Sequence, residues 1–118
     1  GKQISITHTG GPGGGFALYS RVLAKHIVKH IPGNPTAIVQ FKRGGCGMVG
    51  MNYMYNAAAK DGTYLLMPLP GVEAQPFLHP KKVKFDIVKT RWVGNITQMQ
   101  SIISIMPRHK VKKWQDAR

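Results

Sequence analysis

Two glycine-rich strings are the parts of this chain whose residue types and spacing permit chemistry. The first reads Gly-Gly-Pro-Gly-Gly-Gly over residues 10–15, and the second reads Arg-Gly-Gly-Cys-Gly over residues 43–47. Because glycine has no Cβ, such loops let backbone N–H groups approach an anion closely, above all beside a helix N-terminus. Both strings therefore predict non-covalent binding of a phosphate or a carboxylate. A tight strand-to-helix corner is the simpler alternative.

Nucleotide-binding motifs fit these strings poorly. A phosphate-binding loop of the NTPase type ends in Gly-Lys-Ser or Gly-Lys-Thr, whereas the first string ends in Gly-Phe-Ala. The glycines at 45, 47 and 50 match a dinucleotide fingerprint, but the strand that should end in a ribose-binding acid ends in Leu-Met-Pro at 66–68. We therefore expect no nucleotide cofactor.

Catalytic and metal-binding patterns are also weak. Cys46 lies at the start of a predicted helix, where a thiolate is stabilised, but no histidine can be placed beside it from the sequence. His26 and His30 have the i, i+4 spacing of metal ligands, yet no third ligand is evident. The chain has only four acidic residues, and they form no obvious pair for acid–base catalysis. We predict neither an enzyme nor a metal site.

The elements that must position the two loops follow from hydrophobic periodicity. Alternating or β-branched residues predict strands at 3–8, 36–41 and 63–67, and amphipathic spacing predicts helices at 15–30 and 47–59. This order predicts a single α/β domain over residues 1–118, with a doubly wound, mostly parallel sheet. Both glycine loops would then lie side by side at the carboxyl ends of their strands, where such sheets bind ligands.

Finer expectations concern the first helix and the second half of the chain. Five apolar residues at helical spacing predict the packed face of the first helix: Phe16, Tyr19, Val22, Leu23 and Ile27. After residue 67 we expect one short helix between Gly71 and Leu78. Two further strands are predicted at Arg-Trp-Val-Gly-Asn-Ile (91–96) and Ser-Ile-Ile-Ser-Ile-Met (101–106), and the start of a helix at 112–117.

Net charge is the most unusual bulk property. The 118 residues carry 17 Lys and Arg against 4 Asp and Glu, a formal charge of +13. Such an excess predicts a polyanionic neighbour, which is nucleic acid, an acidic protein or an anionic membrane face. No apolar run is long enough for a transmembrane segment. The predicted polyanion contacts are Arg43, Lys81, Lys82, Lys84, Lys89, Arg91, Arg108, Lys110, Lys112 and Lys113.

Longer strings carry a family resemblance. The segments "GPGGGFALYSRVLAKHIVKHIPGNPTAIVQ", "GGCGMVGMNYMYNAAAKDGTYL", "VKFDIVKTRWVGN" and "VKKWQDA" occur in this order. Together they closely resemble the substrate-binding receptors of the tripartite tricarboxylate transporter family, which are bacterial, usually periplasmic proteins with a two-lobed Venus-flytrap fold. The resemblance extends over nearly the whole chain, and it implies that this domain is the first lobe.

The resemblance implies binding of a small carboxylate by backbone N–H groups and water, with a membrane transporter as partner and no cofactor. Tyr19 would pack behind the first loop. The residues of the first wall would be Gly13, Gly14, Gly15 and Phe16. The residues of the second wall would be Gly44, Gly45, Cys46 and Gly47.

This chain departs from the family in both loops. Ala17 replaces an acid that usually follows the aromatic of the first loop, and the usual Pro-Gly-Ala-Gly-Gly of the second loop reads Arg43-Gly-Gly-Cys46-Gly. The sequence also stops near the point where family members cross into their second lobe. We therefore expect the isolated chain to bind citrate or other small dicarboxylates no more tightly than about millimolar.

Two functional hypotheses remain open. In the first, which the charge and the altered loops favour, the chain is a receptor-derived, non-catalytic subunit of a larger RNA-rich assembly with neighbouring proteins, such as a mitochondrial ribosome. In the second, it is part of a working carboxylate receptor of the bacterial periplasm.

Overall fold

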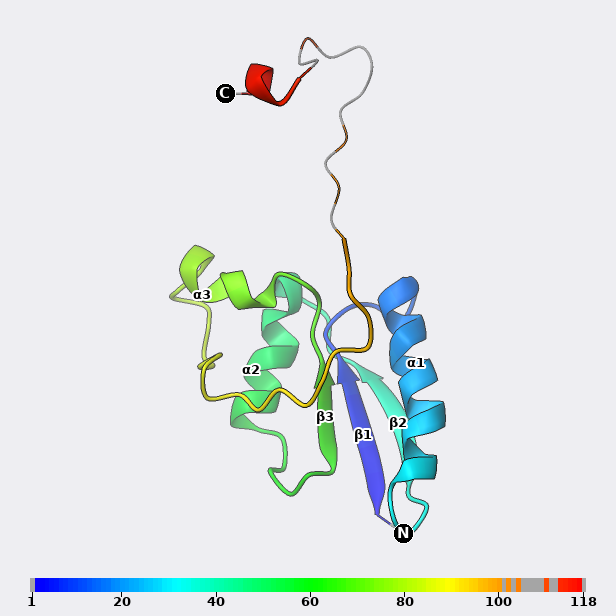
Figure 1. The fold of residues 1–118 in the computed structure, drawn as a ribbon. Coiled ribbons are helices and arrows are strands. Elements are labelled where there is room, and N and C mark those ends of the chain that lie inside the picture. The colour runs from blue at the N-terminus through cyan, green and yellow to red at the C-terminus, as the bar shows by residue number, and fades with distance from the viewer. Residues whose placement is uncertain (1, 101, 103, 105–109, 111–112, 118) are drawn as a thin grey trace.

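The computed structural model describes residues 2–100, 102, 104, 110 and 113–117. It contains one three-stranded parallel sheet, formed by β1 (Gln3–His8), β2 (Thr36–Phe41) and β3 (Tyr64–Met67) in the order β2-β1-β3 (Figure 1). The predicted α/β class and the predicted parallel strands are confirmed, and the strand bounds match within one residue.

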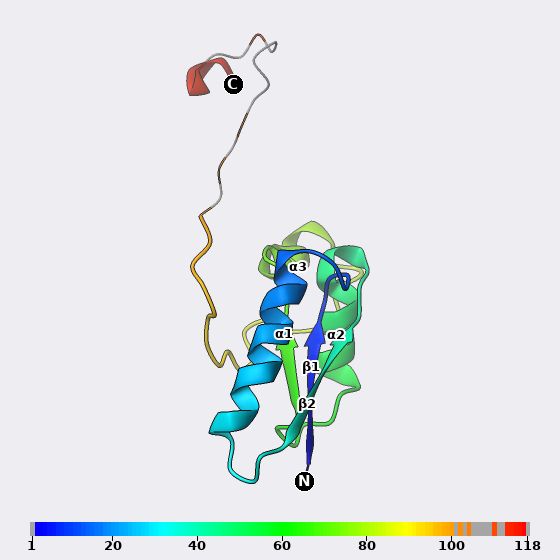
Figure 2. The same cartoon turned by 90° about the vertical axis from the view of Figure 1, so that its right-hand side faces the viewer.

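Two helices connect the strands and cover opposite faces of the sheet. Helix α1 (Gly15–Ile27) continues as a 3₁₀ turn at Val28–His30, and helix α2 (Met48–Asn56) follows a 3₁₀ turn at Gly45–Gly47. Figure 2 shows the strands between α1 and α2. This arrangement is that of a doubly wound sheet, because the chain crosses from β1 to β2 over one face and from β2 to β3 over the other. Helix α2 ends three residues before the predicted bound.

The central strand β1 is buried on both faces. Ile4 and Ile6 are buried as the alternation predicted, but Ser5 and Thr7 are buried as well. Strand β1 pairs with a neighbour on each side and has a helix over each face, so none of its inner residues reaches water. The polar residues of β1 therefore do not mark a solvent-exposed face.

The packed face of α1 differs from the predicted one. Ala17 and Ser20 are fully buried, whereas Tyr19 and Val22 are 41% and 48% exposed. Small side chains let the helix lie close to the sheet, and this close approach turns the larger residues outward. The prediction that Tyr19 and Val22 belong to the packed face is wrong, and the placement of Tyr19 behind the first loop stays a prediction.

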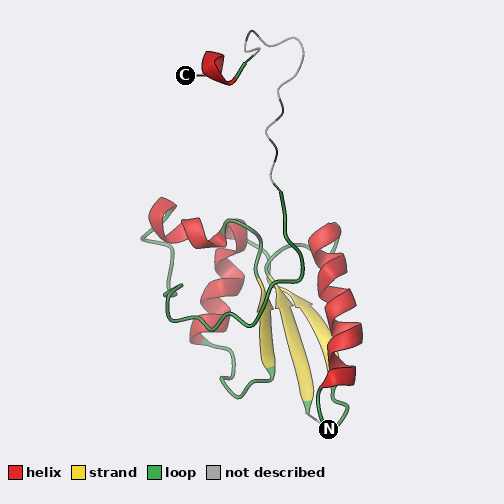
Figure 3. Ribbon diagram, viewed as in Figure 1, coloured by secondary structure: helices red, strands yellow, loops and turns green. Residues whose placement is uncertain are grey.

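The second half of the chain is short of regular structure (Figure 3). The predicted short helix is present as a 3₁₀ turn at Val72–Ala74 followed by α3 (Gln75–Leu78). Residues 82–88 then cross α2, and Val83, Phe85 and Ile87 join the core around Met51.

The two predicted late strands have different outcomes. Residues 91–96 are irregular and exposed, so the predicted strand there is wrong. A strand needs a hydrogen-bonded neighbour as well as apolar residues, and no described segment pairs with this one. The predicted strand at 101–106 lies mostly outside the described residues. A 3₁₀ turn at Trp114–Ala117 begins where a helix was expected.

Candidate anion site at the strand ends

The two glycine loops begin side by side, as predicted. His8 and Phe41 are register partners at the ends of β1 and β2, and the backbone N–H of Lys42 donates to the His8 carbonyl at 2.9 Å. Residues 10–15 continue from β1 into α1, and residues 42–47 continue from β2 into α2, all at the same edge of the sheet (Figure 1). The topology thus brings two loops and two helix N-termini together.

The first loop is open. Gly13, Gly14 and Gly15 are exposed, and a Cβ added to any of them would meet nothing within 4 Å. Gly14 caps α1 with a φ of 87°, and no side chain caps this helix or places an acid in its first turn. The N–H groups of Gly15, Phe16 and Ala17 have no partner within the helix, as for any first turn. This end of α1 therefore offers backbone donors and a positive helix dipole to an incoming anion.

The second loop is tightly wound. Gly44, Gly45, Cys46 and Gly47 all have positive φ, at 132°, 53°, 51° and 92°. The N–H groups of Gly47 and Val49 both donate to the Gly44 carbonyl, at 3.1 and 3.4 Å. The Gly44 carbonyl therefore already uses one donor of this loop and one donor of the first turn of α2. The loop lies beside the candidate site but offers fewer free N–H groups than the first loop.

Cys46 is a residue with a Cβ in a backbone conformation that favours glycine. Its φ of 51° and ψ of 40° are left-handed, a conformation that costs a residue with a Cβ about 1–2 kcal/mol. Its side chain is exposed. Within the described part of the chain, no three His, Cys, Asp or Glu side chains are grouped to hold a metal ion.

Thr9, which no motif in the sequence indicated, connects the ends of β1 and β3 and supports the second loop. Thr9 is fully buried, and its hydroxyl accepts a hydrogen bond from the N–H of Leu69 at 2.8 Å. Its own N–H donates to the Met67 carbonyl at 3.2 Å. A Cβ at Gly47 would lie 3.1 Å from the Thr9 hydroxyl, so the second loop rests directly on this side chain. The only signal in the sequence is a polar residue directly before the first glycine string.

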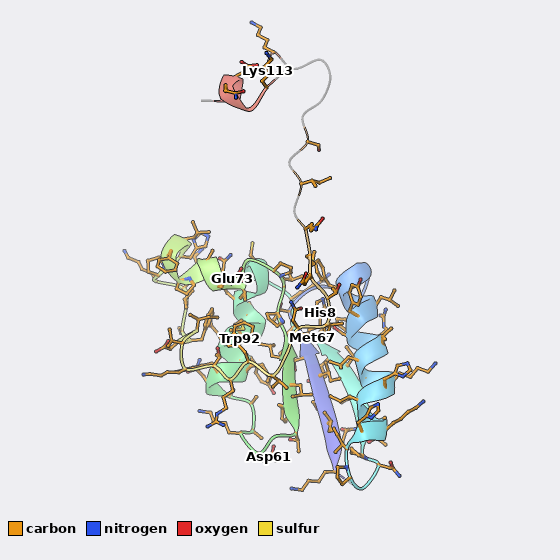
Figure 4. The ribbon with its side chains drawn as sticks, in the orientation of Figure 1. His8, Asp61, Met67, Glu73, Trp92 and Lys113 are labelled. Atoms are coloured by element: carbon orange, nitrogen blue, oxygen red, sulfur yellow. The ribbon has the colours of Figure 1, made fainter. Side chains whose placement is uncertain are left out.

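The His8 ring packs against the start of the first loop, at Gly10. It is 2% exposed, and its Nδ1 lies 3.1 Å from the Met67 carbonyl oxygen, consistent with a hydrogen bond in which Nδ1 donates. Figure 4 shows His8 and Met67 beside each other at the carboxyl ends of the strands. The His8 ring also meets Phe41 edge-on, with centroids 5.9 Å apart.

Family models, curated proteins and solved structures yield no match to this chain. The resemblance of the four longer segments to tripartite tricarboxylate receptors therefore stays a prediction.

Of the predicted polyanion contacts that the structure describes, one lies within a glycine loop. Arg43 is exposed in the second loop, as predicted for a polyanion contact. Lys81, Lys82 and Lys84 are exposed on the segment that crosses α2. Among the remaining candidates, Lys89 lies 3.6 Å from the Asp86 carboxylate, and Arg91, Lys110 and Lys113 are exposed. Arg108 and Lys112 lie outside the described residues.

The segment Lys81–Lys84, here called the basic strap, is fixed by two asparagines of α2. The Asn52 side chain donates to the Lys82 carbonyl at 3.1 Å and accepts from the Lys84 N–H at 2.7 Å. Asn56 donates to the Lys84 carbonyl at 2.7 Å. The backbone of the strap is thus held in place, while its lysine side chains extend into solvent.

No helix among the described residues has the length and apolar character needed to span a membrane.

Proposed function

We propose that the edge formed by the two glycine loops binds a small carboxylate, and that this domain is a lobe of a non-catalytic receptor of the tripartite tricarboxylate transporter type. The observation that carries the proposal is the uncapped N-terminus of α1, which stands behind three open glycines beside the second loop. Non-covalent capture needs donors and a favourable field, and this edge supplies both without a cofactor.

The local charge supports an anion over a neutral ligand. Neither α1 nor α2 has an acidic residue in its first turn, so no side chain of these two turns neutralises the helix dipole there. The net charge of +13 raises the concentration of small anions near the surface. A ligand held from one side only gains a few such contacts, so we expect a dissociation constant near millimolar for the isolated domain.

A backbone donor can be removed without replacing a side chain that packs. Gly15 is the first residue of α1, a position where proline is favoured and where its missing N–H breaks no helical bond. Gly15→Pro deletes one predicted donor to the anion, and Gly15→Ala keeps it. Both side chains would extend into open space.

The experiment is a titration of the isotope-labelled domain with citrate, followed by the amide resonances. We expect citrate to shift the amides of residues 13–17. Gly15→Pro should weaken binding about tenfold, the size expected for one hydrogen bond to a charged group, and Gly15→Ala should bind more tightly than Gly15→Pro. Shifts confined to the basic strap, or equal weakening in both variants, would show that the loop amides are not the site.

A second candidate function is favoured by the basic strap. We propose as the alternative that the domain is a non-catalytic subunit of an RNA-rich assembly, in which Lys81, Lys82 and Lys84 contact phosphates without reading bases. Because Asn52 and Asn56 fix the strap backbone, ordering these lysines on a polyanion costs less than it would on a free segment.

Matched charge reversals test this alternative. Replacing Lys81, Lys82 and Lys84 by glutamate should weaken binding to a single-stranded RNA and lower its salt dependence by about two powers of salt. The control reverses Lys25, Lys29 and Lys60, which are also exposed and change the net charge equally. An equal loss of RNA affinity in both triple variants would show that binding depends only on the total charge. The basic strap would then not be the RNA interface.

A further inference from the structure

The Arg21 side chain of α1 contacts the first glycine loop. The guanidinium of Arg21 donates through Nη2 to the Pro12 carbonyl at 2.7 Å, spanning nine residues. Its central carbon also lies 5.6 Å from the centroid of the Phe41 ring, at the end of β2. Arg21 therefore contacts the middle of the loop and a strand end at the same time.

These contacts continue to the end of the third strand. The Phe41 ring meets the His8 ring edge-on, and the His8 Nδ1 lies within hydrogen-bond distance of the Met67 carbonyl oxygen. The loop also rests on His8 at its start, because a Cβ added to Gly10 would lie 2.7 Å from the His8 Nε2. A continuous series of contacts thus connects the Pro12 carbonyl to β2, β1 and β3.

The first loop has few other means of keeping its shape. Its glycines have no side chains to pack, and added Cβ atoms at Gly11 and Gly13–Gly15 would meet nothing. Of residues 10–15, all of which the structure describes, only Pro12 accepts a hydrogen bond from a side chain. A loop with this composition would otherwise populate many backbone conformations. An anion would then have to order the loop before it could use the amides, and its affinity would fall accordingly.

We propose that Arg21 is a positioning residue of the anion site, a role that rests on the proposed carboxylate-binding function. It holds residues 10–15 so that the amides at the start of α1 converge on the ligand, and it does not contact the ligand itself. Lysine does not substitute for it, because only a planar guanidinium both donates to the carbonyl and stacks over the ring.

The test compares Arg21→Lys and Arg21→Gln with Lys25→Gln, which removes a charge from the next turn of α1 and makes no contact with the loop. The first readout is the backbone order parameter of each amide in the free protein, because the loop amides have no hydrogen bond whose loss hydrogen exchange could report. We expect the order parameters at residues 11 and 13–16 to fall toward the flexible range, below about 0.6, in both Arg21 variants. The order parameters at residues 44–47 should stay unchanged, as should those of the whole protein in Lys25→Gln. Unchanged order parameters in the loop of Arg21→Lys would overturn the proposal.

The second readout is the citrate titration of the same variants. Both Arg21 variants should bind about tenfold more weakly than the wild type, and Lys25→Gln should bind as the wild type does. If Arg21→Lys keeps full affinity and Arg21→Gln loses it, Arg21 acts by its charge and the positioning role is wrong. If the wild type gives no response to citrate, the proposed function fails, while the order parameters still decide whether Arg21 orders the loop.

Discussion

The two glycine loops have similar composition, but glycine serves a different purpose in each. In the first loop, the glycines at 11, 13 and 15 leave open space and do not have positive φ. In the second loop, Gly44 and Gly47 have positive φ and are packed, since added Cβ atoms would lie 2.9 Å from Val49 and 3.1 Å from Thr9. The first loop is open at the surface, whereas two glycines of the second loop pack against neighbouring side chains although residues 43–46 are exposed.

The glycines of the first loop therefore affect access of a ligand, and those of the second loop affect folding. A glycine with open space around it leaves room for a ligand, and substituting it should alter binding. A glycine with positive φ and close neighbours allows the backbone to turn and pack, and substituting it should alter stability. The comparison yields graded predictions, beginning with the position that is packed most tightly.

The largest effect is expected at Gly50, two residues into the buried side of α2. A Cβ there would lie 2.7 Å from the Thr9 methyl group and 3.0 Å from the Lys42 carbonyl oxygen. We expect Gly50→Ala to lower the free energy of unfolding by about 2 kcal/mol, as overpacking does, despite the better helix propensity of alanine. Urea denaturation measures this loss. Gly94→Ala, in open space, is the control and should change stability by less than about 0.5 kcal/mol.

The next effect distinguishes the loops directly. Gly47→Ala should cost about 1 kcal/mol of stability, because φ is 92° and Thr9 is close. Gly13→Ala should leave stability unchanged or slightly raised, and should weaken citrate binding by placing a methyl group at the open face. Unfolding and citrate titration of the same two variants check both halves. Loss of stability in Gly13→Ala would mean that the first loop is also packed.

A smaller effect of opposite sign is expected at Cys46. Cys46→Gly should raise the free energy of unfolding by about 0.5 kcal/mol, because relief of the left-handed strain exceeds the extra entropy of glycine in the unfolded chain. Cys46→Ser keeps the strain and removes the thiol, so it should match the wild type. A gain in both variants would assign the effect to the thiol and not to the backbone.

The smallest effect is expected at Asp61, which lies at the opposite edge of the sheet from both loops (Figure 4). The hydroxyl of Thr63, followed by the Thr63 backbone N–H, donates to the Asp61 carboxylate and lowers its pKa. A lowered pKa in the folded state stabilises the protein above about pH 4, and this contribution is lost as the pH falls through the folded value. The difference in urea midpoint between the wild type and Asp61→Asn should therefore shrink between pH 5 and pH 2.

This acid-sensitive turn is a reference for the loops. Citrate shifts at residues 13–17 should be the same in Asp61→Asn and in the wild type at pH 7. A change in citrate affinity would show that the two edges of the sheet are coupled.

Much of the fold could be predicted from short-range pattern. The residues at 3–8 and 36–41 alternate or are β-branched over six residues, and glycine or proline ends each element, so strand bounds follow locally. The predictions from the sequence were wrong where the outcome depends on a neighbouring element that is distant in the sequence. Residues 91–96 have strand-like composition but no neighbouring strand, and Val22 has helical spacing but faces solvent.

The candidate site was also predicted in part. The sequence identified both loops and placed them at one edge, because parallel strands that follow in order end together. It could not show that the second loop uses its own donors, since the hydrogen bonds to Gly44 follow from the backbone conformation. It also could not show which lysines have a fixed backbone, because Asn52 and Asn56 reach the basic strap across about 30 residues of chain.

The sequence by itself determined the order of strands and helices, the parallel sheet, the two glycine loops and the excess of positive charge. The elements and loops depend on residue types within a few positions of one another, and the charge depends on composition alone. Only the tertiary structure decided that Thr9 joins the strand ends and that Arg21 holds the Pro12 carbonyl. The physical reason is distance along the chain: the Thr9 hydroxyl meets a backbone N–H 60 residues away, and no local pattern encodes a contact that exists only after the sheet has formed.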